Sequence, residues 1–283
     1  MSYRLLRFPG GRGKAVTLSY DDGCDHDVKL LEIINRYGIK CTFNHNSKWL
    51  YNERKITVEQ IKKMLEEGHE VAVHGAEHLA NGLVDPIDGI RDVLECREVL
   101  EKTFGRIIRG LAYPDSGINR FSPGINYETV RNYLKELGIV YARTVGHDND
   151  RFELPADWYN WAPTSHHVNP DLPKYVDKFL SADPNTGYYA DQIPRLFYLW
   201  GHSYEFHDMD NWDLLEDVCG KLGGRDDIWY ATNIEIYDYV NAYNSLIRSA
   251  DNKRIYNPTL IPVWFIADWK TYCVDPGETL VIE

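Results

Sequence analysis

Short apolar, β-branched segments alternate along the chain with longer segments of helical period, and this alternation constrains the fold more than any other feature. The expected strands cover residues 15–20, 39–44, 70–74, 107–113, 140–144, 197–201 and 229–231. The expected helices cover residues 27–37, 57–68, 86–104, 127–138, 210–222 and 234–249. Strand-then-helix repetition builds parallel βαβ units rather than a sandwich. We therefore expect an α/β fold whose strands form a (β/α) barrel.

Two regions depart from this repetition. After about residue 250 the sequence favours short strands and turns, which form a β appendage too small to carry its own core. We therefore divide the chain into a barrel, residues 1–250, and a short β extension packed on it, residues 251–283. Residues 148–192 are weakly periodic and rich in Pro, Trp, Tyr and His. We expect them to form an ordered loop that walls the substrate site.

Composition narrows the class of partner and the compartment. The 283 residues carry a net charge of −12, so phosphate repulsion argues against nucleic acid as a partner. The 13% of aromatic residues suits contact with sugar rings. The five cysteines are scattered without a Cys-x-x-Cys pair, which indicates reduced thiols. No signal peptide or membrane-spanning segment is visible, so we expect a cytoplasmic protein; the sequence does not reveal its oligomeric state.

Carboxylates and imidazoles follow two of the expected strands. Asp21 and Asp22 end the first strand, and His74 and His78 follow the strand at 70–74. In a (β/α) barrel the carboxyl ends of the strands form the active-site rim. One aspartate, Asp22, and the two histidines suit a divalent metal. By ligand type alone Zn²⁺, Co²⁺, Ni²⁺, Mn²⁺ and Fe²⁺ fit about equally well, and Zn²⁺ is our first choice. Asp21 would then lie beside the metal and act as general base on bound water.

Other interpretations of these residues stay open. An Asp-Asp-Gly tripeptide is also a common solvated turn, and two histidines four apart can be coincidence. Two histidines and one carboxylate also form the iron site of Fe(II) oxygenases, although the second aspartate argues against that class. For His166 and His167 we expect solvated or core positions rather than substrate contact.

Four ordered motifs resemble those of a known family. Ser19-Tyr-Asp-Asp-Gly23 resembles the Thr-Phe-Asp-Asp-Gly motif of the polysaccharide deacetylases, the NodB-homology group of carbohydrate esterase family 4. His74-Gly-Ala-Glu-His78 is similar to their metal-binding His-Ser/Thr-x-x-His motif. Ala112-Tyr-Pro-Asp-Ser-Gly117 resembles their third motif and Leu199-Trp-Gly-His202 their last one. The resemblance covers roughly residues 14–245.

The resemblance implies a distorted (β/α) barrel of the NodB-homology type and a metal-dependent hydrolase. Such an enzyme removes acetyl groups from an N- or O-acetylated carbohydrate. The family pattern makes Asp21 the base that activates metal-bound water. It makes Asp22, His74 and His78 the metal ligands, and His202 the general acid that protonates the leaving group.

The resemblance also supplies candidates around this centre. Family members orient the last-motif histidine with an aspartate from a Trp-containing segment, for which Asp157 is our candidate. Many members carry an arginine in the third motif; Ala112 stands there in this chain, and Arg143 could replace it. A backbone N–H near Tyr113 would stabilise the oxyanion. The remaining candidates for the substrate site are Tyr113, Pro114, Trp161 and Trp200.

Two other functions fit parts of the pattern. The missing third-motif arginine allows a non-catalytic carbohydrate-binding relative. A small non-sugar amide as the substrate of an amidohydrolase is also compatible with the motifs. The sequence leaves the sugar, its length and the N- or O-acetyl preference open.

Overall fold

A parallel sheet forms the centre of the computed structural model, which describes residues 3–145 and 149–282. Its strands lie in the order β6-β5-β4-β3-β2-β8-β7, and β9 also pairs with β2. The strands of this sheet are β2 (Lys14–Asp21), β3 (Cys41–His45), β4 (Glu70–Val73), β5 (Gly110–Ala112), β6 (Tyr141–Arg143), β7 (Ser165–His166), β8 (Arg195–Gly201) and β9 (Ile228–Tyr230).

The segment at residues 161–166 joins the two ends of this sheet. At one end, the Trp161 N–H donates to Ala142 O in β6, and the Thr144 N–H donates to Trp161 O. At the other end, β7 pairs in parallel with β8. The sheet therefore curls into a distorted (β/α) barrel, which confirms the fold class expected from the sequence.

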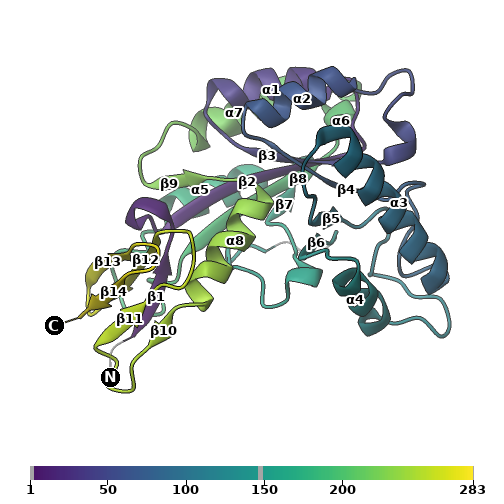
Figure 1. Ribbon diagram of the computed structural model, residues 1–283. Helices are drawn as coiled ribbons and strands as arrows, with labels where there is room; N and C mark the ends of the chain where they lie inside the picture. The colour runs from purple at the N-terminus through teal and green to yellow at the C-terminus, as the bar shows by residue number, and fades with distance from the viewer. Residues whose placement is uncertain (1–2, 146–148, 283) are drawn as a thin grey trace.

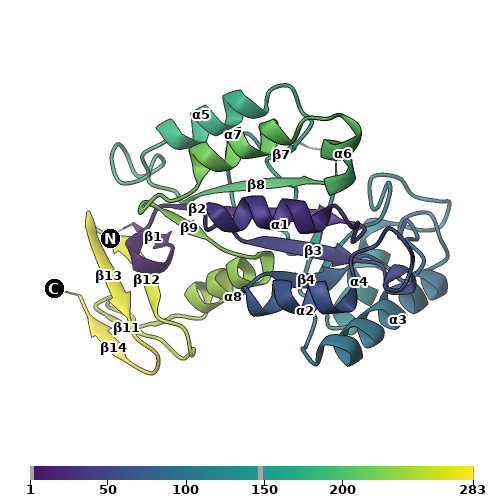
Figure 2. The ribbon, with the colours of Figure 1, turned by 90° about the horizontal axis from the view of Figure 1, so that it is seen from above.

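Helices cover the outside of this barrel. Figure 1 shows α1, α2 and α7 along one side of the sheet, and Figure 2 shows α5 beside α7. The α-helices are α1 (Asp27–Arg36), α2 (Val58–Glu66), α3 (Pro86–Phe104), α4 (Tyr127–Glu136), α5 (Leu172–Ser181), α6 (Ser203–Asp208), α7 (Trp212–Leu222) and α8 (Asn233–Asn244). Short 3₁₀ turns are η1 (Pro9–Gly11), η2 (Ser47–Trp49) and η3 (Trp158–Asn160). None of the helices in the described ranges is both long and apolar enough to cross a membrane.

The two-residue period of the strands decides which side chains enter the barrel. Along β2, Val16, Leu18 and Tyr20 belong to the hydrophobic core between the sheet and the outer helices. Successive side chains of a strand point to opposite faces, so Asp21 faces the barrel interior. The same alternation directs four further side chains inward, namely Asn44 of β3, His74 after β4, Arg143 of β6 and Trp200 of β8.

A buried carboxyl group organises the amino-terminal end of the interior. Glu70 Oε1 accepts a hydrogen bond from the Tyr141 hydroxyl at 2.6 Å. Glu70 Oε2 accepts from Thr42 Oγ1 at 2.7 Å and from the Ile234 N–H at 2.9 Å. Burial raises the pKa of Glu70 to about 7, although these hydrogen bonds oppose the shift. The group therefore ties β4, β6, β3 and the start of α8 together.

The C-terminal strands share sheets with earlier parts of the chain. The two sheets consist of the N-terminal strand β1 (Arg4–Arg7) and the later strands β10 (Ile247–Arg248), β11 (Arg254–Tyr256), β12 (Val263–Ala267), β13 (Lys270–Val274) and β14 (Thr279–Val281). β12 lies between β1 and β13, and β11 lies between β10 and β14. They gather at the left of Figures 1 and 2. The division of the chain at residue 250 stays a proposal, and the β10–β11 pair connects its two sides.

Two expectations about local structure were wrong, and one strand was not predicted. Residues 148–192 are not one long loop, because they contain β7, η3 and α5. Pro173 in the first turn of α5 is a helix-start signal that the weak periodicity obscured. The last long helix ends at Asn244 rather than Ser249, and a strand, β13, follows the hairpin turn at residues 268–269.

The buried Glu70 carboxyl makes stability depend on pH. Its pKa in the folded protein, about 7, lies above the value of about 4.5 for an exposed glutamate, so the folded state binds the proton more tightly. This contribution is complete below pH 4.5 and disappears as the pH rises through 7. We expect the free energy of unfolding of wild type to fall by on the order of 3 kcal/mol relative to Glu70→Gln between pH 4.5 and 8.

Urea unfolding of both proteins across that range measures the effect. Glu66→Gln, at an exposed position of α2, is the control and should follow wild type at every pH. Parallel curves for wild type and Glu70→Gln would contradict the assignment.

Candidate metal and catalytic site

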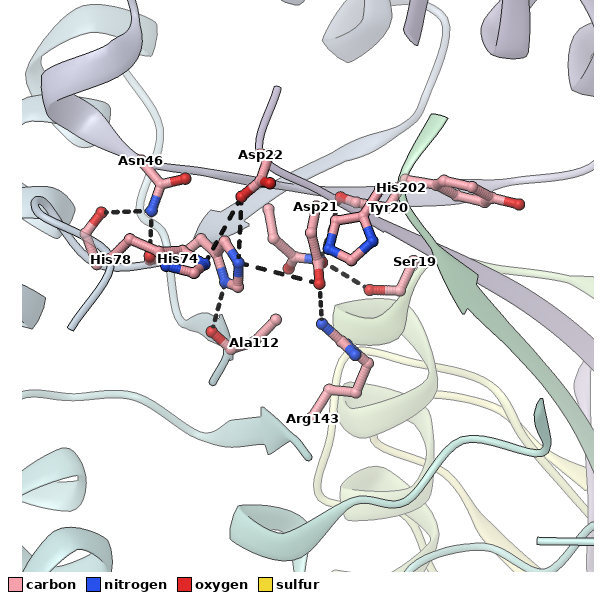
Figure 3. A network of polar contacts seen from close by, with 12 residues as sticks. Ser19, Tyr20, Asp21, Asp22, Asn46, His74, His78, Ala112, Arg143 and His202 are labelled. Atoms are coloured by element: carbon pink, nitrogen blue, oxygen red, sulfur yellow. Dashed lines mark hydrogen bonds and ion pairs between the residues drawn. The ribbon is translucent and has the colours of Figure 1, made fainter. Parts of the chain in front are cut away.

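Asp22, His74 and His78 come together at the carboxyl end of the barrel. Asp22 Oδ1 lies 3.6 Å from His74 Nε2 and 3.7 Å from His78 Nε2 (Figure 3). The ligand atoms of all three residues lie within 4.8 Å of one another. Donors around a tetrahedral zinc ion, at about 2.0–2.1 Å from it, are separated by roughly 3.3–3.5 Å. The spacing therefore fits one divalent cation.

The orientation of the ligand atoms supports the same conclusion. His74 Nδ1 lies 2.9 Å from the carbonyl oxygen of Ala112 and donates to it, so His74 Nε2 presents its lone pair to Asp22 and His78. Asp22 Oδ1 is buried and has no hydrogen-bond partner among the described residues. A buried carboxylate oxygen without a partner is costly. A cation would supply that partner, so the residues present fit the metal.

Helix α3 holds the loop that carries both histidines. Asp92 Oδ1 accepts the Glu77 N–H at 2.6 Å, and the Asp92 carbonyl accepts the Ala76 N–H at 3.1 Å. Gly75 has a φ of +76°, and a Cβ atom there would lie 2.2 Å from Asp92 Oδ2. The loop therefore needs glycine at this position. On the outer side, the His78 ring stacks on Trp49 with a centroid separation of 5.5 Å.

Asp21, the neighbour of Asp22, has different surroundings. Its Oδ1 accepts a hydrogen bond from Asn44 Nδ2 at 2.8 Å, and its Oδ2 forms an ion pair with Arg143 (Figure 3). Burial alone would raise the pKa of Asp21, but Arg143, then His74 and His202, and the Asn44 hydrogen bond together bring it below its ordinary value. Asp21 is therefore held as a carboxylate within 3.9 Å of His74 Nε2.

A second contact also holds the Arg143 side chain in place. Its side chain is fully buried, and its guanidinium carbon lies 4.3 Å from the centre of the Trp200 ring. A guanidinium over an indole face is attracted by the ring quadrupole. The structure thus places Trp200 as a support for Arg143.

His202 follows β8 and is paired with a glutamate. The carboxylate of Glu205 accepts the His202 backbone N–H at 3.0 Å and lies 3.3 Å from His202 Nδ1. Burial alone would lower the pKa of His202, but the Glu205 hydrogen bond and the charges of Asp21 and Asp22 raise it above its ordinary value. The His202 ring is thereby prepared to carry and donate a proton.

Four residues that the sequence suggested for this centre do not make the contacts expected of them. The Tyr113 side chain is buried with its hydroxyl on the carbonyl of Tyr159, and its backbone N–H donates to Arg143 O, so it is not free for an oxyanion. Trp161 is 1% exposed and packs on core aromatic rings, so it cannot stack on a sugar. Pro114 is buried in the turn after β5.

Asp157 is the fourth of these candidates. It caps η3 and accepts the Tyr127 hydroxyl at 2.7 Å, while the partner of His202 is Glu205. The expectation that Asp157 orients His202 is therefore wrong in this structure.

Sequence reasoning missed Asn44 and Glu205. Asn44 is the inward residue at the end of β3, beside Asp21 in the register of the sheet. Glu205 stands three residues after His202, which is the spacing of a capping box at the start of α6. That spacing was a usable signal. His166 and His167 were also given no role, yet each has its Nε2 atom 3.3 Å from Glu205 Oε2.

Comparisons with known proteins place these residues in context. Residues 8–142 match the family model described as polysaccharide deacetylase. A curated relative, "Putative polysaccharide deacetylase YxkH" of Bacillus subtilis (strain 168), is 24% identical over 102 residues. That match covers 36% of this chain and only 37% of the relative.

Solved structures share the fold. A structure described as a "putative polysaccharide deacetylase" from Mycobacterium smegmatis has a TM-score of 0.57 and 20% identity, with 88% of this chain and 99% of that chain covered. Puue allantoinase has a TM-score of 0.58 and 12% identity, covering 82% of this chain and 91% of that chain. At these identities the likeness concerns the barrel alone.

The geometry predicts which substitutions remove the metal. Asp22→Asn replaces the anionic ligand with a neutral amide, and His78→Leu deletes a ligand atom. We therefore expect the zinc affinity of this site to fall by about 100-fold or more in each variant. Zinc titration in competition with a chromophoric chelator measures it. Glu77→Gln, next to His78 but exposed and paired with Lys48, is the control and should bind as wild type does. Unchanged affinity in both ligand variants would contradict the site.

Proposed function

Because the chain belongs to the polysaccharide deacetylase family, we propose that it is a metal-dependent hydrolase that removes acetyl groups from an N- or O-acetylated carbohydrate. One observation carries the proposal: two neighbouring carboxylates have separate partners. Asp22 faces two imidazole nitrogens, and Asp21 faces a guanidinium and an amide. Such a division suits one aspartate for binding a cation and the other for moving a proton.

Asp22, His74 and His78 would hold the metal. Zn²⁺ fits this mixed set of one oxygen and two nitrogens, and Co²⁺, Ni²⁺ or Mn²⁺ are alternatives. When bound, the metal polarises the acetyl carbonyl and lowers the pKa of water. Ala112 keeps His74 in the tautomer required for this role through the 2.9 Å contact with its Nδ1.

Asp21 acts as the general base. Arg143 and Asn44 hold its carboxylate ionised and fix the direction of its oxygens. It accepts the proton of the attacking water as the new carbon–oxygen bond forms. Arg143 sets the charge and the position of Asp21 and does not contact the substrate. Trp200 in turn positions Arg143.

His202 acts as the general acid. Glu205 accepts from its Nδ1, which leaves Nε2 to deliver a proton to the departing nitrogen or oxygen of the sugar. Its raised pKa keeps a protonated fraction near neutral pH. Asp21 and His202 therefore supply base and acid from the carboxyl ends of β2 and β8.

Asp21→Asn tests the division between the aspartates. The amide cannot accept the proton of water, so we expect acetate release to fall by about 10³-fold, within the range for loss of a general base. The zinc content should stay that of wild type, because Asp22, His74 and His78 remain. An enzyme-coupled acetate assay on acetylated sugars and oligosaccharides, with small amides as a second panel, gives the activity; elemental analysis gives the zinc.

The activity of wild type decides whether the hydrolase proposal holds. If it binds zinc but releases no acetate from any panel member, the hydrolase proposal fails and a binding role becomes the better account. If Asp21→Asn retains full activity, the base is another group.

Glu205→Gln separates the acid from its support. We expect kcat to fall about 10-fold in Glu205→Gln and about 100-fold in His202→Gln, because the first leaves an imidazole in place. The double variant should resemble His202→Gln, since residues that act as one unit are not additive. Steady-state kinetics gives kcat for each variant, and we expect KM to stay unchanged. Additive losses would show that Glu205 acts independently of His202.

A further inference from the structure

A second group of potential ligand atoms surrounds Glu205. Three imidazole nitrogens lie 3.3 Å from the same atom, Glu205 Oε2: the Nε2 atoms of His166 and His167 and the Nδ1 atom of His202. His166 and His167 come from the segment that joins β6 to β8, and His202 and Glu205 come from the end of β8 and the start of α6. The barrel closure therefore brings two distant segments to one carboxylate oxygen.

The spacing in this group is that of a coordination shell. The ligand atoms of His166, His202 and Glu205 lie within 4.8 Å of one another. A separation of 3.3 Å between an imidazole nitrogen and a carboxylate oxygen equals the edge expected for a tetrahedral zinc site with bonds of about 2.0–2.1 Å. It is longer than an ordinary charge-assisted hydrogen bond of about 2.7–2.9 Å.

His167 supplies an independent observation. Its side chain is fully buried between Tyr20 and Phe206, and neither ring nitrogen has a hydrogen-bond partner among the described residues. Buried polar atoms without partners are rare and need an explanation. Its Nε2 points toward the same oxygen of Glu205, so a cation there would offer this nitrogen a partner.

The proton on His166 sets the strength of such a site. The Val168 N–H donates to His166 Nδ1 at 3.2 Å, so neutral His166 carries its proton on Nε2, facing Glu205. Coordination through Nε2 requires that proton to leave and Nδ1 to carry one, which ends the Val168 contact. By contrast, His74 already has its proton on Nδ1 and its Nε2 free. This second site is therefore weaker than the site of Asp22, His74 and His78.

We propose that His166, His202 and Glu205 form a second divalent-metal site, next to the buried His167, that fills after the first and inhibits the enzyme. The inhibitory part rests on the proposed function. A metal on His202 Nδ1 prevents the ring from holding two protons, so the ring no longer has an acidic proton for the leaving group. The binding part stands without it.

Zinc binding to the full chain tests the site directly. Calorimetric titration with Zn²⁺, followed by dialysis and elemental analysis, should give two ions per wild-type chain. His166→Leu and His166→Gln should each leave the tight ion and weaken the second at least 10-fold. His78→Leu should weaken the tight ion and leave the weaker one unchanged.

His207→Leu is the matched control. It removes a histidine of α6 whose ring lies against that of His26, outside the group, so this variant should bind two ions. A wild type that binds one ion, or His166 variants that bind two with unchanged affinity, would overturn the proposal. Thermal unfolding of each variant verifies that it is folded.

Activity adds a second readout. Within each protein, acetate release at excess zinc is divided by release at one equivalent. This ratio should be below one for wild type and His207→Leu. The zinc concentration that inhibits should be at least 10-fold higher in the His166 variants. Equal inhibition of all proteins would overturn the inhibitory part. Two bound ions without any acetate release would contradict the proposed function but support the second metal site.

Discussion

The buried ion pair between Asp21 and Arg143 is the interaction on which the rest of the site depends. It joins the carboxyl ends of β2 and β6 across the barrel, where both side chains are almost inaccessible to water. Loss of one partner of such a pair leaves an uncompensated charge and costs about 3–5 kcal/mol. Asn44 donates a hydrogen bond to Asp21, and Trp200 presents an aromatic face to Arg143, so each charge has one further favourable contact. The ion pair keeps one carboxylate ionised next to the proposed cation site.

Much of the site could be predicted because the strand ends carry it. Asp21, Asp22, His74 and His78 directly follow apolar segments whose two-residue period is visible in the sequence. The alternation within Tyr141-Ala-Arg143 also shows that Arg143 faces the same way as Tyr141, into the barrel. For these residues, local pattern and position in the fold coincide.

The remaining residues depend on contacts that no local pattern encodes. Tyr113 and Trp161 are aromatic residues near strand ends, but whether such a ring faces a groove or a core is decided by the neighbours it meets. The segment that closes the barrel pairs through only two residues of β7, too short for a period to be seen. Its histidines therefore looked like loop residues, and their meeting with Glu205 is a consequence of closure.

One backbone feature explains why two adjacent carboxylates can serve one centre. Neighbouring residues of a regular strand point to opposite faces, so Asp22 would face the outer helices if β2 continued. Instead Asp22 has a φ of +73°, in the left-handed region, and Gly23 follows at +57°. This turn directs Asp22 back toward His74 and His78, whose loop also ends in a left-handed residue at His78. At the two non-glycine residues, Asp22 and His78, such a conformation costs about 1–3 kcal/mol and persists where surrounding contacts require it. The end of the strand thus sets which aspartate faces the two imidazoles and which one faces Arg143 and Asn44, as the proposed division of roles requires.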